Sequence, residues 1–199
     1  MQVALVDAGG ANIGSVRYAL QRLGVEAILT HDAGLIRSAD RVILPGVGTA
    51  AIVMGRLHAL ELVDTLRALQ QPLLGVCVGM QLLFEHSEED DTPCLGLLPG
   101  RVRKLRASIG LRVPHMGWNT LQHRKPASIT DGMHDGDYAY FVHSYAAPVS
   151  EDCLMSSDHG EPFAAIVQRS NVAGAQFHPE RSAAVGAQLL KNFLEAGPA

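Results

Sequence analysis

The sequence predicts an α/β protein with three layers, in which an open, mostly parallel sheet carries flanking helices and added antiparallel strands. Three observations lead to this fold class. Over the first two-thirds of the 199 residues, short apolar runs alternate with segments of helical periodicity. From Leu97 onward the pattern becomes rich in strands. No repeat, linker or change of composition divides the chain, so we expect residues 1–199 to form a single domain.

The first strand is expected at residues 3–6, where the run Val-Ala-Leu-Val is apolar throughout. A turn with two glycines follows, and Asn12 is suited to the N-cap of a helix. That helix is predicted from apolar residues at helical spacing, namely Ile13, Val16, Leu20 and Leu23, and Gly24 ends it. Further strands are expected at residues 25–30 and 41–44, and Pro45 and Gly46 stop the second of them.

A helical stretch is expected over residues 49–69, with a break near residues 59–61. The apolar run at residues 72–76 predicts a short buried strand that leads into Cys77, and a helix-like segment follows at residues 80–84. Residues 85–92 are acidic and polar, which indicates a surface loop. Its four consecutive acids are expected to form a solvated turn without chemistry; they are Glu88, Glu89, Asp90 and Asp91.

The C-terminal part of the chain is dominated by strand patterns. Strands are expected at residues 100–105, 138–145, 163–168 and 172–176. The last two are close enough in sequence to form a hairpin through residues 169–171. A closing helix is predicted at residues 182–194, because one of its faces is apolar, with Val185, Leu189, Leu190 and Phe193.

Composition and charge exclude several classes of protein. With 47% hydrophobic and 18% charged residues the chain resembles an ordinary globular protein, and its net charge of −4 offers no basic surface for a nucleic acid. No apolar run approaches the roughly 20 residues that span a bilayer. The N-terminal segment lacks the basic start and cleavage site of a signal peptide. We therefore expect a cytoplasmic protein with neither nucleic acid nor membrane as partner.

The three cysteines cannot all pair, and none belongs to a CxxC metal or redox pair, so we expect no metal and no cofactor. Cys77 stands apart because Gly75 and Gly79 flank it between an apolar strand and a helix, the pattern of a nucleophile elbow. The turn requires glycines for close approach, and the N-terminus of the helix favours a thiolate. Taken alone, the motif fits a small buried cysteine equally well. Cys94 and Cys153 are expected to be inert.

A cysteine nucleophile requires a general base and a group that orients the base. Among nine histidines, His178 ends an apolar strand and is followed by Pro179 and Glu180. Open α/β sheets place active sites at the C-terminal edge of their strands, where the Glu180 carboxylate could accept the imidazole N–H. A capping or surface histidine is the alternative for His178 alone. The elbow and the strand-end histidine together favour a triad of Cys77, His178 and Glu180.

These residues resemble class I (triad-type) glutamine amidotransferases. The family patterns G-x-C-x-G-x-Q and F-H-P-E are both matched without a gap, by residues 75–81 and 177–180. The resemblance implies a thiolate nucleophile at Cys77, an acid and base at His178, and an orienting carboxylate at Glu180. It also implies glutamine as substrate, no cofactor, and an acceptor of ammonia elsewhere.

Further segments resemble the glutaminase subunits of imidazole glycerol phosphate synthases in histidine biosynthesis. They are residues 45–48, 114–119 and 140–145, in the same order along the chain. The resemblance implies a heterodimer with a (β/α)₈-barrel cyclase, which uses the ammonia to make imidazole glycerol phosphate and aminoimidazole carboxamide ribotide. Two departures are small: Val78 replaces a common leucine, and Arg181 replaces a frequent lysine, which keeps the charge but changes hydrogen-bond geometry.

The resemblance also implies the contacts of glutamine. Gly46 and Val47 would offer a backbone N–H to the oxyanion beside the N–H of Val78, after a peptide of their loop flips. Gln81 would hold the substrate, and the backbone of His143, Ser144 and Tyr145 would clamp its amino and carboxylate groups. The alternatives are a strand end at Gly46, an exposed helix glutamine at Gln81, and an ordinary core strand at residues 143–145.

Four residues are candidates for a partner interface: Asn12, Trp118, Tyr138 and Arg181. Trp118, the only tryptophan, is expected in a loop, and tryptophan is enriched in interfaces. A buried core tryptophan is the alternative. Three other functions are alternatives: an amidotransferase serving pyridoxal phosphate or anthranilate synthesis, a regulatory module that lost the chemistry, and a flavodoxin-like nucleotide binder. The last of these lacks a GxGxxG fingerprint after the first strand.

Overall fold

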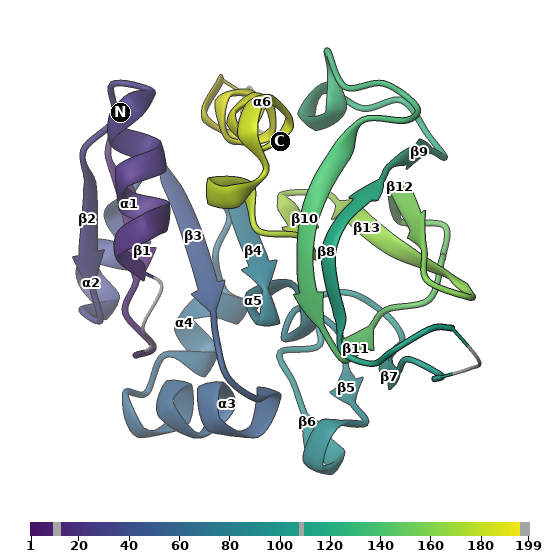
Figure 1. Ribbon diagram of the computed structural model, residues 1–199. Coiled ribbons are helices and arrows are strands. Elements are labelled where there is room, and N and C mark those ends of the chain that lie inside the picture. Colours follow the sequence, from purple (N-terminus) through teal and green to yellow (C-terminus); the bar gives the residue numbers. More distant parts are fainter. Residues whose placement is uncertain (10–12, 108–109, 196–199) are drawn as a thin grey trace.

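The protein is a three-layer α/β structure in the computed structural model, which describes residues 1–9, 13–107 and 110–195 (Figure 1). The predicted N-cap Asn12 therefore lies outside the described residues. An eight-stranded sheet forms the middle layer, with strand order β2-β1-β3-β4-β14-β13-β12-β9. In that order the strands are Ala27–Thr30, Val3–Val6, Arg41–Gly46, Leu73–Cys77, Val172–Ala175, Pro162–Arg169, Cys153–Asp158 and Gln122–His123.

The first five strands of this sheet are parallel and the remaining three are antiparallel. Strands β1, β4 and β14 are buried at every residue, as expected for central strands covered on both faces. Strand β13 turns directly into β14 through Ser170 and Asn171, which confirms the predicted hairpin. The predicted fold class is confirmed.

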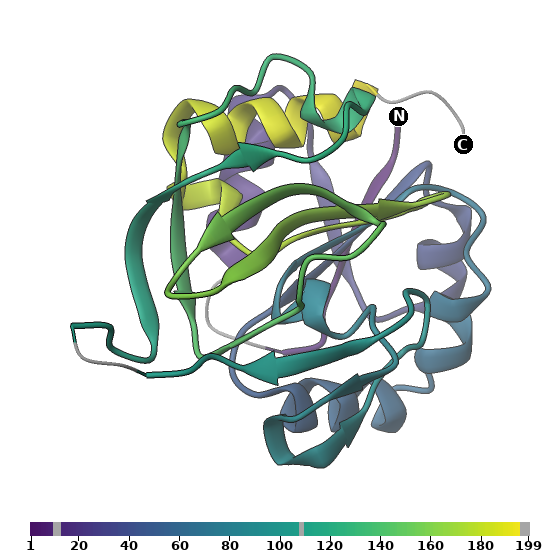
Figure 2. The ribbon, with the colours of Figure 1, turned by 90° about the vertical axis from the view of Figure 1, so that its right-hand side faces the viewer.

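Helices cover both faces of the sheet (Figures 1 and 2). Helix α1 (Ile13–Arg22) and helix α6 (Ala183–Glu195) both pack against the short 3₁₀ turn η3 (Pro179–Arg181). Helices α2 (Ala33–Ser38) and α4 (Val63–Arg67) lie on the other side, and α3 (Ala50–Ala59) lies below the ends of the strands in Figure 1. Glu61, with a φ of 56°, separates α3 from α4, which confirms the predicted break. None of the helices in the described part of the chain is long and apolar enough to cross a bilayer.

Two smaller sheets flank the main one. One is the antiparallel ribbon of β8 (His115–Thr120) and β10 (Tyr138–His143). The other has the order β11-β7-β5-β6, with strands Tyr145–Ala146, Arg101–Lys104, His86–Ser87 and Thr92–Pro93. Two further 3₁₀ turns are η1 (Glu89–Asp91) and η2 (Ser128–Thr130). The predicted strand at residues 138–145 is therefore two strands in different sheets, interrupted at Ser144.

Three other sequence predictions need correction. Strand β3 does not stop before Pro45, because Pro45 and Gly46 pair with Val76 and Cys77 of β4. Proline is tolerated there because it stands next to the end of the strand. The helix after Cys77 is α5 (Val78–Gln81), which begins at the elbow itself and ends before residues 82–84. Trp118 belongs to β8, not to a loop.

Candidate active site

The backbone turns sharply at Cys77, where β4 ends and α5 begins. Cys77 has φ 55° and ψ −113°, a backbone conformation that residues other than glycine rarely adopt. This confirms the predicted strain. The flanking glycines are required by contact. A Cβ on Gly79 would lie 1.9 Å from the carbonyl oxygen of Leu44, and one on Gly75 would lie 2.6 Å from the carbonyl oxygen of Gly79. Close packing of strand and helix thus holds Cys77 at the bend.

His178 follows β14 and lies on a loop that several hydrogen bonds attach to β10. The backbone N–H of His178 donates to the carbonyl of Tyr140 at 3.0 Å. The Ser182 hydroxyl donates to the carbonyl of His178 at 2.7 Å and accepts from the N–H of Tyr140 at 2.9 Å. The Nδ1 atom of His178 lies 2.9 Å from Oε1 of Glu180. The imidazole is therefore fixed by its neighbours in sequence and by the adjacent ribbon.

Cys77 and His178 interact directly, because both a hydrogen bond with Cys77 and its charge act on the imidazole of His178. Burial alone would lower the pKa of His178, but the hydrogen bonds with Cys77 and Glu180 and the charges of both groups raise it to about 10. The protein thus favours an imidazolium beside the sulfur. The structure brings together the three residues that the sequence predicted as a triad, although Cys77 ends β4 and His178 lies on the loop after β14.

A cavity of about 190 Å³ opens beside the sulfur of Cys77. All four residues that the sequence assigned to glutamine binding line it, and so does Val78 after the elbow. The lining residues are Gly48, Cys77, Val78, Gln81, Glu89, Pro114, Val142, His143, Ser144 and Tyr145. Gly46 and Val47 instead line a second, much smaller cavity of about 10 Å³ together with His178 and Glu180. Of the three residues from Gly46 to Gly48 at and after the end of β3, only Gly48 therefore lines the cavity beside the sulfur.

The amide of Gln81 is held in one orientation. Its Nε2 atom donates to the carbonyl of Tyr145 at 2.8 Å and to Oε1 of Gln176 at 3.1 Å. Since an amide nitrogen has only two hydrogens, Oε1 is the polar atom that Gln81 has left for the cavity. Gln176, which also places its Nε2 4.0 Å from the sulfur of Cys77, was not among the predicted site residues. Its signal in the sequence was a polar residue between two apolar ones, directly before Phe177 and His178.

Comparison with known proteins agrees with this geometry. The family model for glutamine amidotransferase class-I matches residues 4–196. The chain belongs to the class-I glutamine amidotransferase family. It is 61% identical over 193 residues to the imidazole glycerol phosphate synthase subunit HisH of Xanthomonas oryzae pv. oryzae, a match that covers 97% of this chain and 96% of the relative. It is 59% identical to the subunit of the same name from Xylella fastidiosa, which covers 98% and 97% of the two chains.

Solved structures share the amidotransferase fold. A crystal structure of a glutamine amidotransferase superimposes with a TM-score of 0.75 at 21% identity, and 97% of each chain is covered. The structure of PurLQS from Thermotoga maritima gives a TM-score of 0.72 at 18% identity, again with 97% of each chain covered. At such low identity these likenesses concern the fold alone.

Glu89 is a residue of this amidotransferase that sequence reasoning missed. The expectation of a solvated turn is wrong for it, because its half-buried carboxylate lines the cavity and accepts the N–H of Ala50 at 2.8 Å. Burial raises the pKa of Glu89, the hydrogen bond with Ala50 lowers it and the charge of Asp90 raises it, with a net upward shift. Four acids in a row carried no signal that could distinguish the one facing inward.

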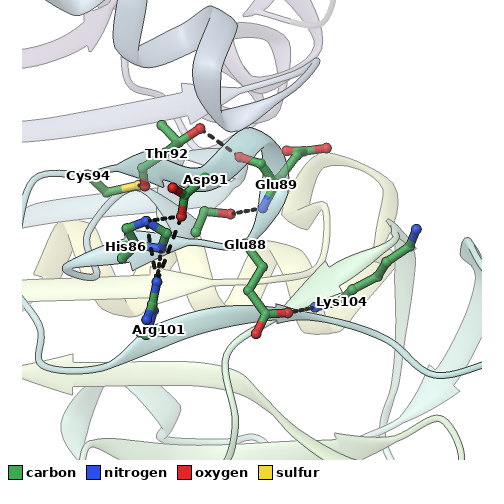
Figure 3. Close-up of polar contacts among 9 residues, drawn as sticks. His86, Glu88, Glu89, Asp91, Thr92, Cys94, Arg101 and Lys104 are labelled. Carbon is green, nitrogen blue, oxygen red and sulfur yellow. Dashed lines mark hydrogen bonds and ion pairs between the residues drawn. The ribbon is translucent and has the colours of Figure 1, made fainter.

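The loop that presents Glu89 is held by its own polar contacts (Figure 3). The hydroxyl of Thr92 donates to the carbonyl of Glu89 at 2.6 Å, and Ser87 accepts the N–H of Glu89 at 3.2 Å. His86 and Asp91 pair at 2.9 Å. The two residues after Glu89 have left-handed φ values of 54° and 47°, so the loop is strained where it turns the carboxylate inward.

Three of the four predicted interface residues lie on one exposed surface, while Asn12 lies outside the described residues. Trp118 and Tyr138 are 52% and 57% exposed on the outer face of the β8–β10 ribbon, so Trp118 is not a core residue. Arg181 is exposed and its guanidinium lies 4.4 Å from the centre of the Tyr140 ring, which also contacts Trp118 edge-on. We call this surface the ribbon face and include the exposed Met116 in it.

Proposed function

We propose that this chain is the glutaminase subunit of an imidazole glycerol phosphate synthase, working in the cytoplasm as a single amidotransferase domain. In this role it hydrolyses glutamine to glutamate and ammonia and delivers the ammonia to a cyclase subunit. The observation that carries the proposal is the interacting set of Cys77, His178 and Glu180, of which Cys77 lines the cavity that Gln81 and Glu89 also line. The high identity to subunits named HisH supports the pathway.

The chemistry uses the sulfur of Cys77 as nucleophile and the protonated ring of His178 as acid. The thiolate of Cys77 attacks the γ-carbonyl carbon of glutamine, and the carbonyl electrons move to its oxygen. His178, an imidazolium, gives its proton to the amide nitrogen as the C–N bond breaks, and ammonia leaves a glutamyl thioester. Water then attacks the thioester while His178 accepts a proton, and glutamate departs with the thiolate restored. Glu180 keeps the imidazole oriented through both steps.

Glutamine binds with its α-ammonium near the carboxylate of Glu89 and Oε1 of Gln81. These are the acceptors that the lining of the cavity offers to a cation, and the charge of Glu89 makes the hydrogen bond stronger than a neutral one. The backbone of His143, Ser144 and Tyr145 completes the wall around the α-carboxylate and α-ammonium. An analogue lacking the amino group would leave the carboxylate of Glu89 without a cationic partner, so the site selects substrates that carry the amino group.

The oxyanion of the tetrahedral intermediate is stabilised by the backbone N–H of Val78 and by the loop of Gly46, Val47 and Gly48. Val78 is the first residue of α5, so its N–H is free of helical hydrogen bonds. Gly48 has a φ of 98°, a conformation that permits a peptide of this loop to turn without a clash of Cβ. A flip of that peptide completes the oxyanion hole and gives the partner a means to control hydrolysis.

Ammonia that escaped into neutral water would be protonated and lose its nucleophilicity, so a tight contact with the acceptor subunit is required. The ribbon face is suited to this contact because Arg181 is three residues from His178 and its guanidinium lies over the ring of Tyr140, which contacts the exposed Trp118. We propose that a (β/α)₈-barrel cyclase binds there as the heterodimer partner and uses the ammonia to form imidazole glycerol phosphate and aminoimidazole carboxamide ribotide.

The test uses the purified complex with its cyclase. Cys77→Ala should abolish synthesis from glutamine and leave synthesis from ammonium salts intact, because the cyclase needs only ammonia. Cys153→Ala is the matched control, since Cys153 is buried in β12 outside the cavity and should retain both activities. Glutamine-dependent synthesis by Cys77→Ala would reject Cys77 as nucleophile. Failure of the unmodified complex to use either nitrogen source would reject the pathway.

A further inference from the structure

Two buried histidines that the chemistry does not use lie next to the glutamine cavity. His115 of β8 and His143 of β10 face each other across the ribbon, and Nδ1 of His115 is 2.9 Å from Nε2 of His143. Both residues are almost completely buried, with exposed fractions of 5% and 6%. The ring of His115 is stacked on His159 and Phe141, with centroid distances of 4.2 and 5.0 Å. Each imidazole is hydrogen-bonded at both ring nitrogens, so hydrogen bonds as well as packing hold it in place.

The groups at the two ends of this series of hydrogen bonds determine which ring nitrogen donates and which accepts. Nδ1 of His143 lies 2.9 Å from the carbonyl oxygen of Tyr145, which can only accept, so Nδ1 carries a proton. In a neutral ring Nε2 of His143 is then an acceptor, and Nδ1 of His115 must donate to it. Nε2 of His115 in turn accepts from Nδ2 of Asn119 at 3.2 Å. These residues therefore form a hydrogen-bonded chain, in which every donor points the same way, from Asn119 through both rings to Tyr145.

The hydrogen-bonded chain reaches the substrate site at Tyr145. Its carbonyl oxygen accepts from His143 and also from Nε2 of Gln81 at 2.8 Å. The orientation of the Gln81 amide, and with it the direction of Oε1, depends on where that carbonyl lies. Asn119 anchors the other end of the chain, since its Nδ2 donates to the carbonyl of Asp158 at 2.7 Å and its Oδ1 accepts from the N–H of Thr120 at 2.8 Å.

The hydrogen-bonded chain requires that the rings of His115 and His143 are both uncharged. A proton added to Nε2 of His143 would face the N–H of His115, and one added to Nε2 of His115 would face the amide of Asn119. Burial lowers the pKa of His115 to about 4 and that of His143 to about 3, and the charges of neighbouring histidines add to both effects. Those neighbours are His159 for both rings, with His115 and His178 in addition for His143. At neutral pH the hydrogen bonds are thus intact.

We propose that His115 and Asn119 are positioning residues of the glutamine site, which act through the side chain of His143 to hold the Tyr145 carbonyl and, through it, Gln81. This role depends on the proposed function, because Gln81 is taken to bind the α-ammonium of glutamine. None of the three side chains in the chain touches the reacting atoms. Their loss should therefore weaken the binding of substrate while the reactivity of the sulfur stays the same.

The test compares His115→Phe with His115→Asn in the complex with the cyclase. Phenylalanine keeps the ring against Phe141 and His159 but removes both hydrogen bonds. Asparagine can place its amide nitrogen where Nδ1 was and donate to His143. We expect His115→Phe to raise KM for glutamine roughly tenfold with a much smaller change in kcat, since the buried hydrogen bond that holds His143 is lost, and His115→Asn to recover most of the difference. The rate at which iodoacetamide alkylates Cys77 should match that of the unmodified protein in both variants.

His123→Phe is the matched control, because Nε2 of His123 on β9 donates to the carbonyl oxygen of Met133 and His123 lines a different depression. It should leave KM unchanged. An unchanged KM in a folded His115→Phe variant would overturn the proposal, and so would equal increases in His115→Phe and His115→Asn, which would indicate packing alone. If His115→Phe does not fold, Asn119→Leu takes its place, and an unchanged KM there would likewise overturn it. Failure of the proposed function would show earlier, as an unmodified complex without glutamine turnover.

Discussion

Oε1 of Glu180 lies 2.9 Å from Nδ1 of His178, and the two side chains belong to residues only two positions apart in the chain. The single turn η3, which starts at Pro179, brings both side chains to the same side of the loop. Because Nδ1 donates to the carboxylate, the other ring nitrogen is the one left for the thiol. A short rigid segment after β14 therefore supplies both the base and the group that orients it. Cys77 is brought close to them because β4, which it ends, is the neighbour of β14 in the sheet.

Glu180→Gln should test this orientation directly. The amide can present an N–H to Nδ1, which favours the wrong tautomer, so we expect kcat for glutamine hydrolysis to fall by a factor on the order of 10³–10⁴. Steady-state glutaminase kinetics in the presence of the cyclase would measure it. Glu195→Gln, at the exposed end of α6, is the control and should have unchanged kinetics. A loss of less than tenfold in Glu180→Gln would contradict an orienting role.

The pKa of His178 should depend on the sulfur. Its value of about 10 reflects the hydrogen bond and the charge of Cys77 as well as those of Glu180, both opposed by burial. In Cys77→Ala the contribution of the sulfur is absent, so the pKa of His178 should fall markedly, toward a value set by Glu180 and burial. Imidazole chemical shifts followed by NMR over a pH titration would report the change. Identical titrations in the two proteins would show that the sulfur and the ring do not interact.

Two glycine-to-alanine substitutions should have opposite effects on stability. In Gly79→Ala the new Cβ meets the backbone of Leu44 at 1.9 Å, which no rotamer can relieve, so the free energy of unfolding should fall by about 3 kcal/mol or more. Gly55 is exposed on α3 with open space around its Cα, so Gly55→Ala should raise the free energy of unfolding by about 0.5–1 kcal/mol. Urea denaturation at neutral pH measures both. An unchanged free energy of unfolding in Gly79→Ala would mean that the backbone around Cys77 can shift to accommodate the added Cβ.

Acid should destabilise the folded protein through His115 and His143. Their pKa values in the folded state, about 4 and about 3, are below the ordinary value of 6.5. Between pH 6.5 and pH 4 the unfolded chain therefore binds protons that the folded chain does not, so the free energy of unfolding falls as the pH is lowered, by up to about 1.4 kcal/mol per pH unit for each ring. Denaturation curves at several pH values should have a shallower dependence in His115→Phe. An identical dependence would show that these rings do not carry the effect.

The ribbon face should be needed for assembly. Trp118→Ala and Tyr138→Ala each remove an exposed aromatic ring, and if these rings are central to the contact, each change should weaken binding of the cyclase by about 2 kcal/mol, or roughly thirtyfold in Kd. Calorimetric titration of the two subunits would measure the loss. Leu35→Ala, an exposed apolar residue on α2, serves as the control for a general effect of truncation. Wild-type affinity in both ribbon variants would place the partner elsewhere.

Sequence reasoning succeeded where local rules act. The Gly-x-Cys-x-Gly pattern predicted the strained bend because only glycine allows the strand and helix around Cys77 to approach so closely. The hairpin between β13 and β14 and the break between α3 and α4 followed from residues within a few positions of each other. Prediction was least accurate where a boundary depends on distant partners. Strand β3 continues through Pro45 because β4 lies beside it, and the strand predicted at residues 138–145 is divided because its halves pair with β8 and β7.

By itself, then, the sequence determined the α/β class, the bend at Cys77 and the stiff loop that pairs His178 with Glu180, since each depends on sterics, periodicity and dihedral preferences among residues close in sequence. Only the tertiary structure decided that Glu89 turns into the cavity while its acidic neighbours do not, that Trp118 lies on a strand, and that Asn119, His115 and His143 form one chain ending at Tyr145. Those features arise when segments far apart in the chain meet, and the direction of a side chain there is set by which backbone packs against it.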